Sequence, residues 1–182
     1  MIPISDEAVR TLNEYGMKSL KILDNGDLDW ESIAIKVVDM DMGKIDLDSK
    51  SISSYLNGEM LDGFSGKSPE DQLSRYLRDN TYSQAYSNLQ DSMGLPNTKQ
   101  IKSELQNLAI EQFGLDSIPR VTPHDHFSTK QMMFVPFDIH HLINHNGAIT
   151  VYKNSIKTIA MAFESAIKNI PIGRILVDMS IN

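Results

Sequence analysis

The sequence predicts an α+β protein with more helix than strand. Several stretches repeat apolar residues at every third and fourth position, which is the spacing of an amphipathic helix. Other stretches are short apolar runs bounded by turn residues, as expected of strands. We expect a mostly helical N-terminal part with a short acidic β-hairpin over residues 1–117, and a hairpin-helix core with a C-terminal helix over residues 118–182. The whole chain is also of a size that forms one compact domain.

The composition narrows the possible functions. Of the 182 residues, 41% are hydrophobic and 23% are charged, as in ordinary globular proteins. The chain contains no cysteine, which excludes disulfides, thiolate zinc sites and cysteine nucleophiles. The net charge of −7 and the pI near 5.1 argue against a protein that coats nucleic acid. We expect no contact with membranes, because no apolar run approaches the roughly 20 residues of a span and the first residues lack a signal-peptide pattern.

The first two thirds of the chain predict helices around one short strand. Ser5 is expected to cap a helix over residues 5–23, and residues 33–38 are expected to form a strand. The following segment, 39–48, carries acids at alternate positions, but their spacing does not fit an EF-hand calcium loop. We therefore expect an acidic hairpin turn there. Residues 51–68 contain three glycines and are expected to form a loop. Three further helices are expected, over residues 69–79, 81–93 and 97–113.

All five histidines of the chain lie close together in the sequence. They are His124, His126, His140, His141 and His145. Imidazole both binds metal ions and transfers protons near neutral pH. Asp125 adds a carboxylate between the first two histidines. Scattered surface histidines would not be expected to cluster in this way, so the sequence predicts a metal centre built from imidazole and carboxylate.

The cluster falls on a predicted hairpin and helix. Residues 124–126 end one strand, and residues 131–135 form a second, apolar strand. A helix is expected to begin at Phe137, to carry the other three histidines and to end at Gly147. Two more elements are expected beyond it, an amphipathic helix over residues 152–169 and a strand over residues 172–179.

Helical geometry constrains which histidines can share one ion. At about 100° per residue, His141 and His145 lie about 40° apart and share one face of a helix. His140 and His145 lie about 140° apart on a regular helix. Those two meet one ion only if His140 precedes the helix or stands in a distorted first turn. Geometry alone therefore favours His141 with His145.

The same residues resemble a known nuclease family. The run contains His124-Asp125-His126, then Met133-Phe134-Val135-Pro136, then Ile139-His140, and finally His145-Asn146-Gly147. It resembles the HNH/endonuclease VII (His-Me finger) nucleases, most closely the polymorphic-toxin branch, whose pattern begins Trp-His-His-His and ends His-x-Gly-Gly. The spacings match without a gap over residues 121–147. Three positions depart from the pattern, where Pro123 replaces Trp, Asp125 replaces the middle His and Ala148 replaces the second Gly.

The resemblance implies a ββα-metal core with one divalent metal ion. Nitrogen and oxygen ligands of this kind admit Mg, Mn, Ni or Zn. The resemblance implies Asp125, His140 and His145 as the metal ligands. Helical geometry offers His141 as the alternative to His140. His126 is expected to be the general base that activates water, and His124 is the alternative base. Arg120 and Lys130 are the nearest cations for substrate phosphates.

The activity implied by the resemblance is phosphodiester hydrolysis by a metal-dependent endonuclease, acting on DNA rather than RNA. The implied setting is a toxin or effector that is secreted or delivered, acts in the target-cell cytoplasm and is neutralised by a cognate immunity protein. Nucleic acid is expected to approach over residues 120–157, where basic residues outnumber acidic ones. Two other interpretations stay open, a non-catalytic metal-binding or interaction module and a metallohydrolase that acts on other phosphoesters.

Overall fold

The fold combines helices with two small antiparallel sheets, so the predicted α+β class is confirmed. This computed structural model describes residues 6–19, 21, 23, 29–40, 44–125, 131–142, 154 and 174–178. The chain divides into two compact units. Unit 1 comprises residues 1–39, 85–126 and 131–145, and unit 2 comprises residues 40–84, 127–130 and 146–182.

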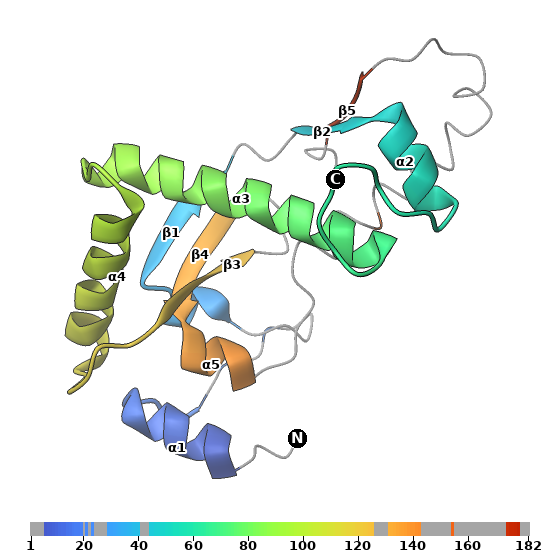
Figure 1. Ribbon diagram of the computed structural model, residues 1–182. Coiled ribbons are helices and arrows are strands. Elements are labelled where there is room, and N and C mark those ends of the chain that lie inside the picture. Colours follow the sequence, from blue (N-terminus) through green and yellow to red (C-terminus); the bar gives the residue numbers. More distant parts are fainter. Residues whose placement is uncertain are drawn as a thin grey trace. The chain divides into compact units, whose positions relative to one another are not determined.

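The sheet of unit 1 has three antiparallel strands. They are β1 (Lys36–Asp39), β3 (Val121–Asp125) and β4 (Gln131–Pro136), in the spatial order β1-β4-β3 (Figure 1). The central strand β4 is apolar and buried from its second residue onward, because other side chains pack against both of its faces. Pro123 lies on the edge strand β3, where its missing N–H costs no hydrogen bond within the sheet.

The two faces of β4 pack against different parts of unit 1. On one face, Met133 and Val135 join a buried cluster whose other members are Tyr15, Trp30, Ile33 and Ile139. On the other face, the ring of Phe134 meets Tyr86 edge-on, with centroids 5.3 Å apart. This alternation follows from the two-residue period of a strand. It makes β4 the centre of the core of unit 1.

Short helical elements cover the first of these faces. The helix α1 (Asp6–Glu14) packs against α5 (Phe137–Leu142), and the 3-10 turn η1 (Trp30–Ile33) packs against β4. The Asp29 carboxylate accepts a hydrogen bond from the N–H of Ser32 at 3.3 Å and so caps η1. This cap holds Trp30 at the start of the turn, with its side chain in the core.

The helix α4 (Thr98–Phe113) contacts β3 and is capped at both ends. At its start, the Asn97 side chain accepts a hydrogen bond from the N–H of Gln100 at 3.0 Å. At its end, Gly114 adopts a left-handed conformation with φ of 63°, which glycine tolerates without strain. The helix predicted over residues 97–113 is thus confirmed.

Unit 2 contains a two-stranded sheet followed by a helix. Strand β2 (Lys44–Asp48) pairs antiparallel with β5 (Arg174–Asp178), which confirms the strand predicted near the end of the chain. The Asp48 carboxylate then caps α2 (Ser49–Leu56) by accepting a hydrogen bond from the N–H of Ser51 at 2.7 Å. This hydrogen bond lowers the pKa of Asp48 below its usual value.

The predicted acidic hairpin over residues 39–48 is wrong. Strand β1 pairs with β4 and strand β2 pairs with β5, so the two strands belong to different sheets. The alternating acids lie in segments that do form strands. The partner strands, β4 and β5, lie far away in the sequence, and a local pattern cannot specify them. The loop predicted over residues 51–68 is also wrong in its first part, which belongs to α2. Ile52 and Tyr55 are buried there, and this packing stabilises a serine-rich helix that its local propensity does not favour.

The predicted helix boundaries differ in two places. The first helix ends at Glu14 rather than at residue 23, because Gly16 takes a left-handed conformation with φ of 66° just beyond it. The two helices predicted over residues 69–79 and 81–93 are one helix, α3 (Pro69–Met93). After Pro69 this segment contains no glycine or proline that would end it. The predicted helix over residues 152–169 lies, apart from Asn154, outside the described residues.

None of the described helices combines the length and the apolar character that crossing a bilayer requires.

Candidate functional site

The β3–β4 hairpin and the helix α5 carry the described part of the histidine cluster. His124 and Asp125 are the last two residues of β3, and His140 and His141 lie in α5, which directly follows β4. The N–H of Phe137 donates a hydrogen bond to the carbonyl of Arg120 at 2.9 Å. This bond ties the start of α5 to the residue that precedes β3, so the helix and the hairpin hold each other in place.

Two of the histidines meet in this arrangement. The ring centroids of His124 and His140 lie 5.3 Å apart, with their planes at 70°. The indole of Trp30 lies beside both rings, with its centroid 4.2 Å from that of His124 and 5.5 Å from that of His140. His124 is 4% exposed, whereas His140 is half-buried. The candidate site therefore consists of two imidazoles packed against the indole of Trp30, and the imidazole of His140 is the one that reaches solvent.

Asp125 faces away from this pair. His124 lies opposite Met133 in the register of the sheet, and Asp125 lies opposite Met132. Directly opposite residues share a face, and successive residues alternate. His124 therefore points to the face that carries Trp30, and Asp125 points to the other face, where it is 7% exposed. The structure brings His124 and His140 together but separates Asp125 from His124 by the plane of the sheet.

His141 lies in a different environment from His140. Its ring stacks on Phe137 with centroids 5.5 Å apart and planes at 9°, and the residue is exposed. The guanidinium of Arg120 lies 3.8 Å from the centre of the same Phe137 ring. Arg120 also forms an exposed ion pair of 3.5 Å with Asp138. Any contact of Arg120 with a substrate phosphate therefore competes with two contacts inside the protein.

A buried tyrosine lies next to α5. Tyr15 is 5% exposed and packs edge-on against Phe113. Its burial, followed by the charge of Asp138 and a hydrogen bond to that carboxylate, raises the pKa of Tyr15 to about 12. The neutral hydroxyl is thus favoured at physiological pH, and it lies near the Asp138 carboxylate in the first turn of α5.

The separation of the two imidazole rings is compatible with their binding one metal ion. Nitrogen binds Zn at about 2.1 Å, which puts each imidazole centroid roughly 3 Å from the ion, so two imidazoles at a tetrahedral angle have centroids roughly 5 Å apart. The separation of 5.3 Å between His124 and His140 fits this value. Within the described ranges no group of three or more His, Cys, Asp or Glu side chains is placed to hold an ion. His126 and His145, the other predicted members, lie outside those ranges, as does Lys130.

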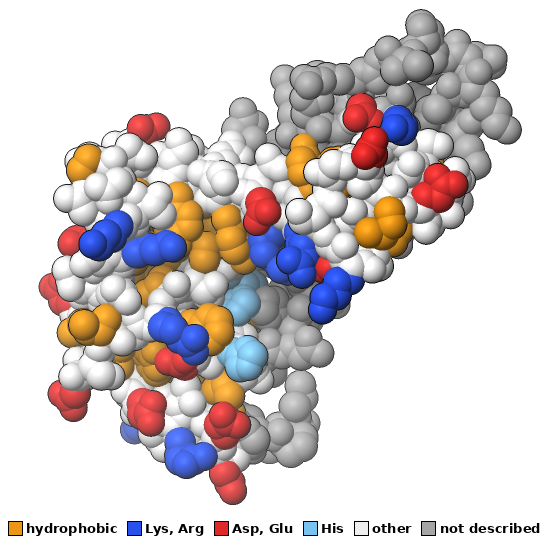
Figure 2. Space-filling model, viewed as in Figure 1, with side chains coloured by type: hydrophobic (Ala, Val, Ile, Leu, Met, Phe, Trp, Pro, Cys, Tyr) orange, Lys and Arg blue, Asp and Glu red, His pale blue; other side chains and the backbone are white. Residues whose placement is uncertain are grey.

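The site is accessible from solvent. Figure 2 shows histidine side chains that reach the surface beside hydrophobic side chains. Of the imidazole pair, His140 is half-buried and His124 is 4% exposed, so a ligand from solvent meets His140 first.

Sequence analysis did not identify Trp30 as part of this site. Trp30 is the only tryptophan of the chain, and it comes from a 3-10 turn far from the histidines in the sequence. No spacing or motif connects it to them. The one local signal was Asp29, a residue that favours the start of a helical turn, but that signal does not say what the turn packs against.

Comparisons with known proteins give no match, whether to protein families, to curated proteins or to solved structures.

Proposed function

We propose that the chain is a divalent-metal-dependent endonuclease with a ββα-metal core, which hydrolyses phosphodiester bonds in DNA. The observation that carries this proposal is the meeting of His124 and His140 at the end of a β-hairpin and on the helix that follows it. A hairpin and a helix that present imidazoles to one point are what the resemblance of residues 121–147 implies.

The proposed roles combine this geometry with the resemblance. His140 is the proposed metal ligand on α5, because it faces His124, whereas His141 stacks on Phe137. The resemblance implies Asp125 and His145 as further ligands and His126 as the base that takes a proton from water. Asp125 points to the opposite face of the sheet from His124, so its assignment rests on the resemblance alone. A divalent ion bound there stabilises charge on the phosphoryl oxygens and on the leaving 3′-oxygen. The ring separation would also suit His124 as a ligand.

Two neighbouring histidines provide a matched test. We expect the purified chain to nick supercoiled plasmid with Mg, Mn, Ni or Zn and to stop when EDTA is added. His140→Ala should reduce nicking by at least about a hundredfold, as expected when a metal ligand is lost. His141→Ala removes the same side chain from the adjacent, exposed position and should leave nicking within about twofold, as expected for a surface substitution.

Other results would select other functions. Equal loss in both variants would contradict the assignment of His140. Nicking that persists in EDTA would exclude a metal-dependent reaction. Hydrolysis of a small phosphodiester without plasmid nicking would identify a metallohydrolase that acts on other phosphoesters. Metal binding without hydrolysis of either substrate would identify a non-catalytic metal-binding module.

The proposed biological setting is that of a toxin or effector restrained by an immunity protein, and it rests on the resemblance alone. Inducible expression in bacteria should slow growth and degrade the chromosome. The His140→Ala variant, expressed to the same level, should do neither. Equal growth arrest by both proteins would contradict a toxic nuclease.

A further inference from the structure

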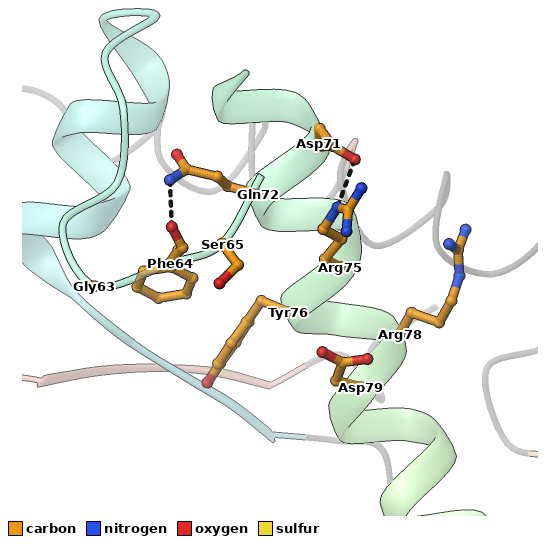
Figure 3. Close-up of a pocket in the computed structure, with 9 residues that line it drawn as sticks. All are labelled: Gly63, Phe64, Ser65, Asp71, Gln72, Arg75, Tyr76, Arg78 and Asp79. Atoms are coloured by element: carbon orange, nitrogen blue, oxygen red, sulfur yellow. Dashed lines mark hydrogen bonds and ion pairs between the residues drawn. The ribbon is translucent and has the colours of Figure 1, made fainter. Parts of the chain in front are cut away.

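Unit 2 contains a cavity that sequence analysis did not anticipate. It lies between the loop that follows α2 and the part of α3 that belongs to unit 2 (Figure 3). Its volume of about 580 Å³ falls within the range of roughly 300–1,000 Å³ that is typical of small-molecule sites. The lining residues are Gly63, Phe64, Ser65, Asp71, Gln72, Arg75, Tyr76, Arg78 and Asp79.

The loop that forms one wall of the cavity is fixed to the helix by Gln72. The amide oxygen of Gln72 accepts a hydrogen bond from the N–H of Leu61 at 2.8 Å. Its amide nitrogen donates to the carbonyls of Leu61 at 3.1 Å and Phe64 at 2.6 Å. A Cβ at Gly66 would lie 2.6 Å from the backbone nitrogen of Gln72, so the loop packs as closely as glycine allows. The cavity is thus preformed, which reduces the entropy cost of binding.

Two aromatic rings form one side of the cavity. Phe64 and Tyr76 meet edge-on, with centroids 4.9 Å apart and planes at 61°. Both residues are half-buried. Because Phe64 is only half-buried, part of its ring is exposed and is available for stacking with a planar ligand.

Charged side chains of α3 also line the cavity. Asp71 accepts hydrogen bonds from the N–H of Lys67 at 2.8 Å and from Nε of Arg75 at 3.0 Å, and these bonds lower its pKa. The ionised carboxylate therefore orients the Arg75 guanidinium, whose outer nitrogens remain as donors. Arg78 and Asp79 follow on the same helix, and neither side chain forms an ion pair or hydrogen bond within the described part of the chain (Figure 3).

We propose that this cavity binds a nucleotide unit, meaning one aromatic base with its phosphate. The base stacks on the ring of Phe64, with Tyr76 beside it, and Arg75 and Arg78 bind the phosphate oxygens. Asp79 accepts a hydrogen bond from an amino group of the base. An inorganic anion alone would leave the rings unused, and an apolar ligand would desolvate two guanidinium groups without compensation. The unit is either a free nucleotide or one residue of a single strand, and the site does not depend on the nuclease activity.

Isothermal calorimetry on the full chain in EDTA tests this site without any cleavage. The probes are AMP, adenosine, inorganic phosphate and a short single-stranded oligo(dA). We expect AMP to bind about tenfold or more tightly than either adenosine or phosphate, since each of these makes only part of the contacts. Arg78→Gln should weaken AMP binding about tenfold, as expected for the loss of charge-assisted hydrogen bonds. Arg10→Gln is the matched control, because Arg10 is an exposed arginine of α1 that does not line the cavity, and it should leave AMP binding unchanged.

The results distinguish a site for a single strand from a site for a free nucleotide, and both from the absence of a nucleotide site. Tighter binding of oligo(dA) than of AMP, lost in Arg78→Gln, would identify a strand-binding site. Equal or tighter binding of AMP would identify a site for a free nucleotide. The proposal is overturned if neither AMP nor oligo(dA) binds at low salt, or if Arg78→Gln and Arg10→Gln weaken binding equally. Plasmid nicking is measured separately, so a failure here leaves the proposed nuclease function untouched.

Discussion

The indole of Trp30 lies against the imidazole of His124, with ring centroids 4.2 Å apart and planes tilted by 32°. The contact joins a 3-10 turn near the start of the chain to the end of β3. Since Trp30 is the only tryptophan and is 2% exposed, the tryptophan emission of this protein comes from the floor of the candidate site.

This position makes Trp30 a reporter for metal binding. We expect Ni²⁺ to quench its emission with a saturable dependence on concentration, because an open-shell ion bound at the neighbouring imidazoles lies close to the indole. His140→Ala should abolish the saturable quenching, and His141→Ala should retain it. Quenching that is identical in both variants would show that Ni²⁺ binds elsewhere.

His126→Ala tests the proposed base. This substitution should abolish plasmid nicking while metal affinity, measured by calorimetry, stays nearly that of the unmodified protein, because a base acts on water and not on the ion. If nicking survives and metal affinity is lost instead, His126 is a ligand and His124 takes the role of the base.

Metal affinity also tests the ligands. His145→Ala and Asp125→Ala should each weaken metal binding by about tenfold or more, since removal even of a partner of a ligand costs about this much. Asp125 makes the sharper test, because it points to the opposite face of the sheet from His124. A normal metal affinity in Asp125→Ala together with a weakened affinity in His124→Ala would show that the imidazole of His124, and not the carboxylate of Asp125, is a metal ligand.

Local signals predicted much of the fold around the site. Turn residues bounded the apolar segment that became β4, and the helix predicted over residues 97–113 corresponds to α4. The pairing of β1 with β4 was not predictable, because strand partners are chosen by contacts between segments far apart in the sequence. The same limit explains why α2 was missed. Its residues have weak helical propensity, and burial of Ile52 and Tyr55 supplies the stabilisation.

The site shows the same division between local and long-range information. The clustering of histidines in the sequence identified the region, and the β3–β4 hairpin and the start of a helix at Phe137 agree with the prediction. The predicted end of that helix at Gly147 lies outside the described residues. Helical geometry alone favoured His141, yet the described structure pairs His140 with His124 and stacks His141 on Phe137. The angle between residues on a helix does not specify which side of a short helix faces the strand beside it. That side is set here by Ile139, which is buried in the core.

Gln72 is expected to contribute strongly to the stability of unit 2. It is 3% exposed, and its amide makes three hydrogen bonds to the backbone of the loop. Gln72→Leu would leave the buried N–H of Leu61 without its acceptor, so we expect a loss of about 2–3 kcal/mol in the free energy of unfolding. Gln90→Leu, at an exposed position of α3 with one hydrogen bond of 3.2 Å, should cost about 0.5 kcal/mol. Equal losses in urea denaturation would contradict an anchoring role for Gln72.

Tyr15 should make the protein sensitive to alkaline pH. Burial and the Asp138 carboxylate raise the pKa of Tyr15 to about 12 in the folded protein, whereas an unfolded tyrosine titrates near pH 10. Between these values the folded state holds a proton that the unfolded state has lost. The stabilisation is therefore complete below about pH 10 and is lost as the pH rises toward about 12, with a slope of at most about 1.4 kcal/mol per pH unit. Burial also raises the pKa of Tyr86 and of Tyr55, and the Tyr55 hydroxyl additionally donates to Glu70 at 2.6 Å, so the loss has the same sign at all three positions.

Tyr15→Phe isolates the contribution of this one hydroxyl. The variant should be less stable than the unmodified protein by about 1 kcal/mol near neutral pH, because it loses the interaction of the buried hydroxyl with the nearby Asp138 carboxylate. The difference between the two free energies of unfolding should stay constant up to about pH 10 and then decrease, because only the unmodified protein has this titration to lose. Urea denaturation at a series of pH values measures both quantities. A difference that stays constant up to about pH 12 would mean that Tyr15 ionises equally in the folded and unfolded states, and that neither its burial nor Asp138 affects its proton.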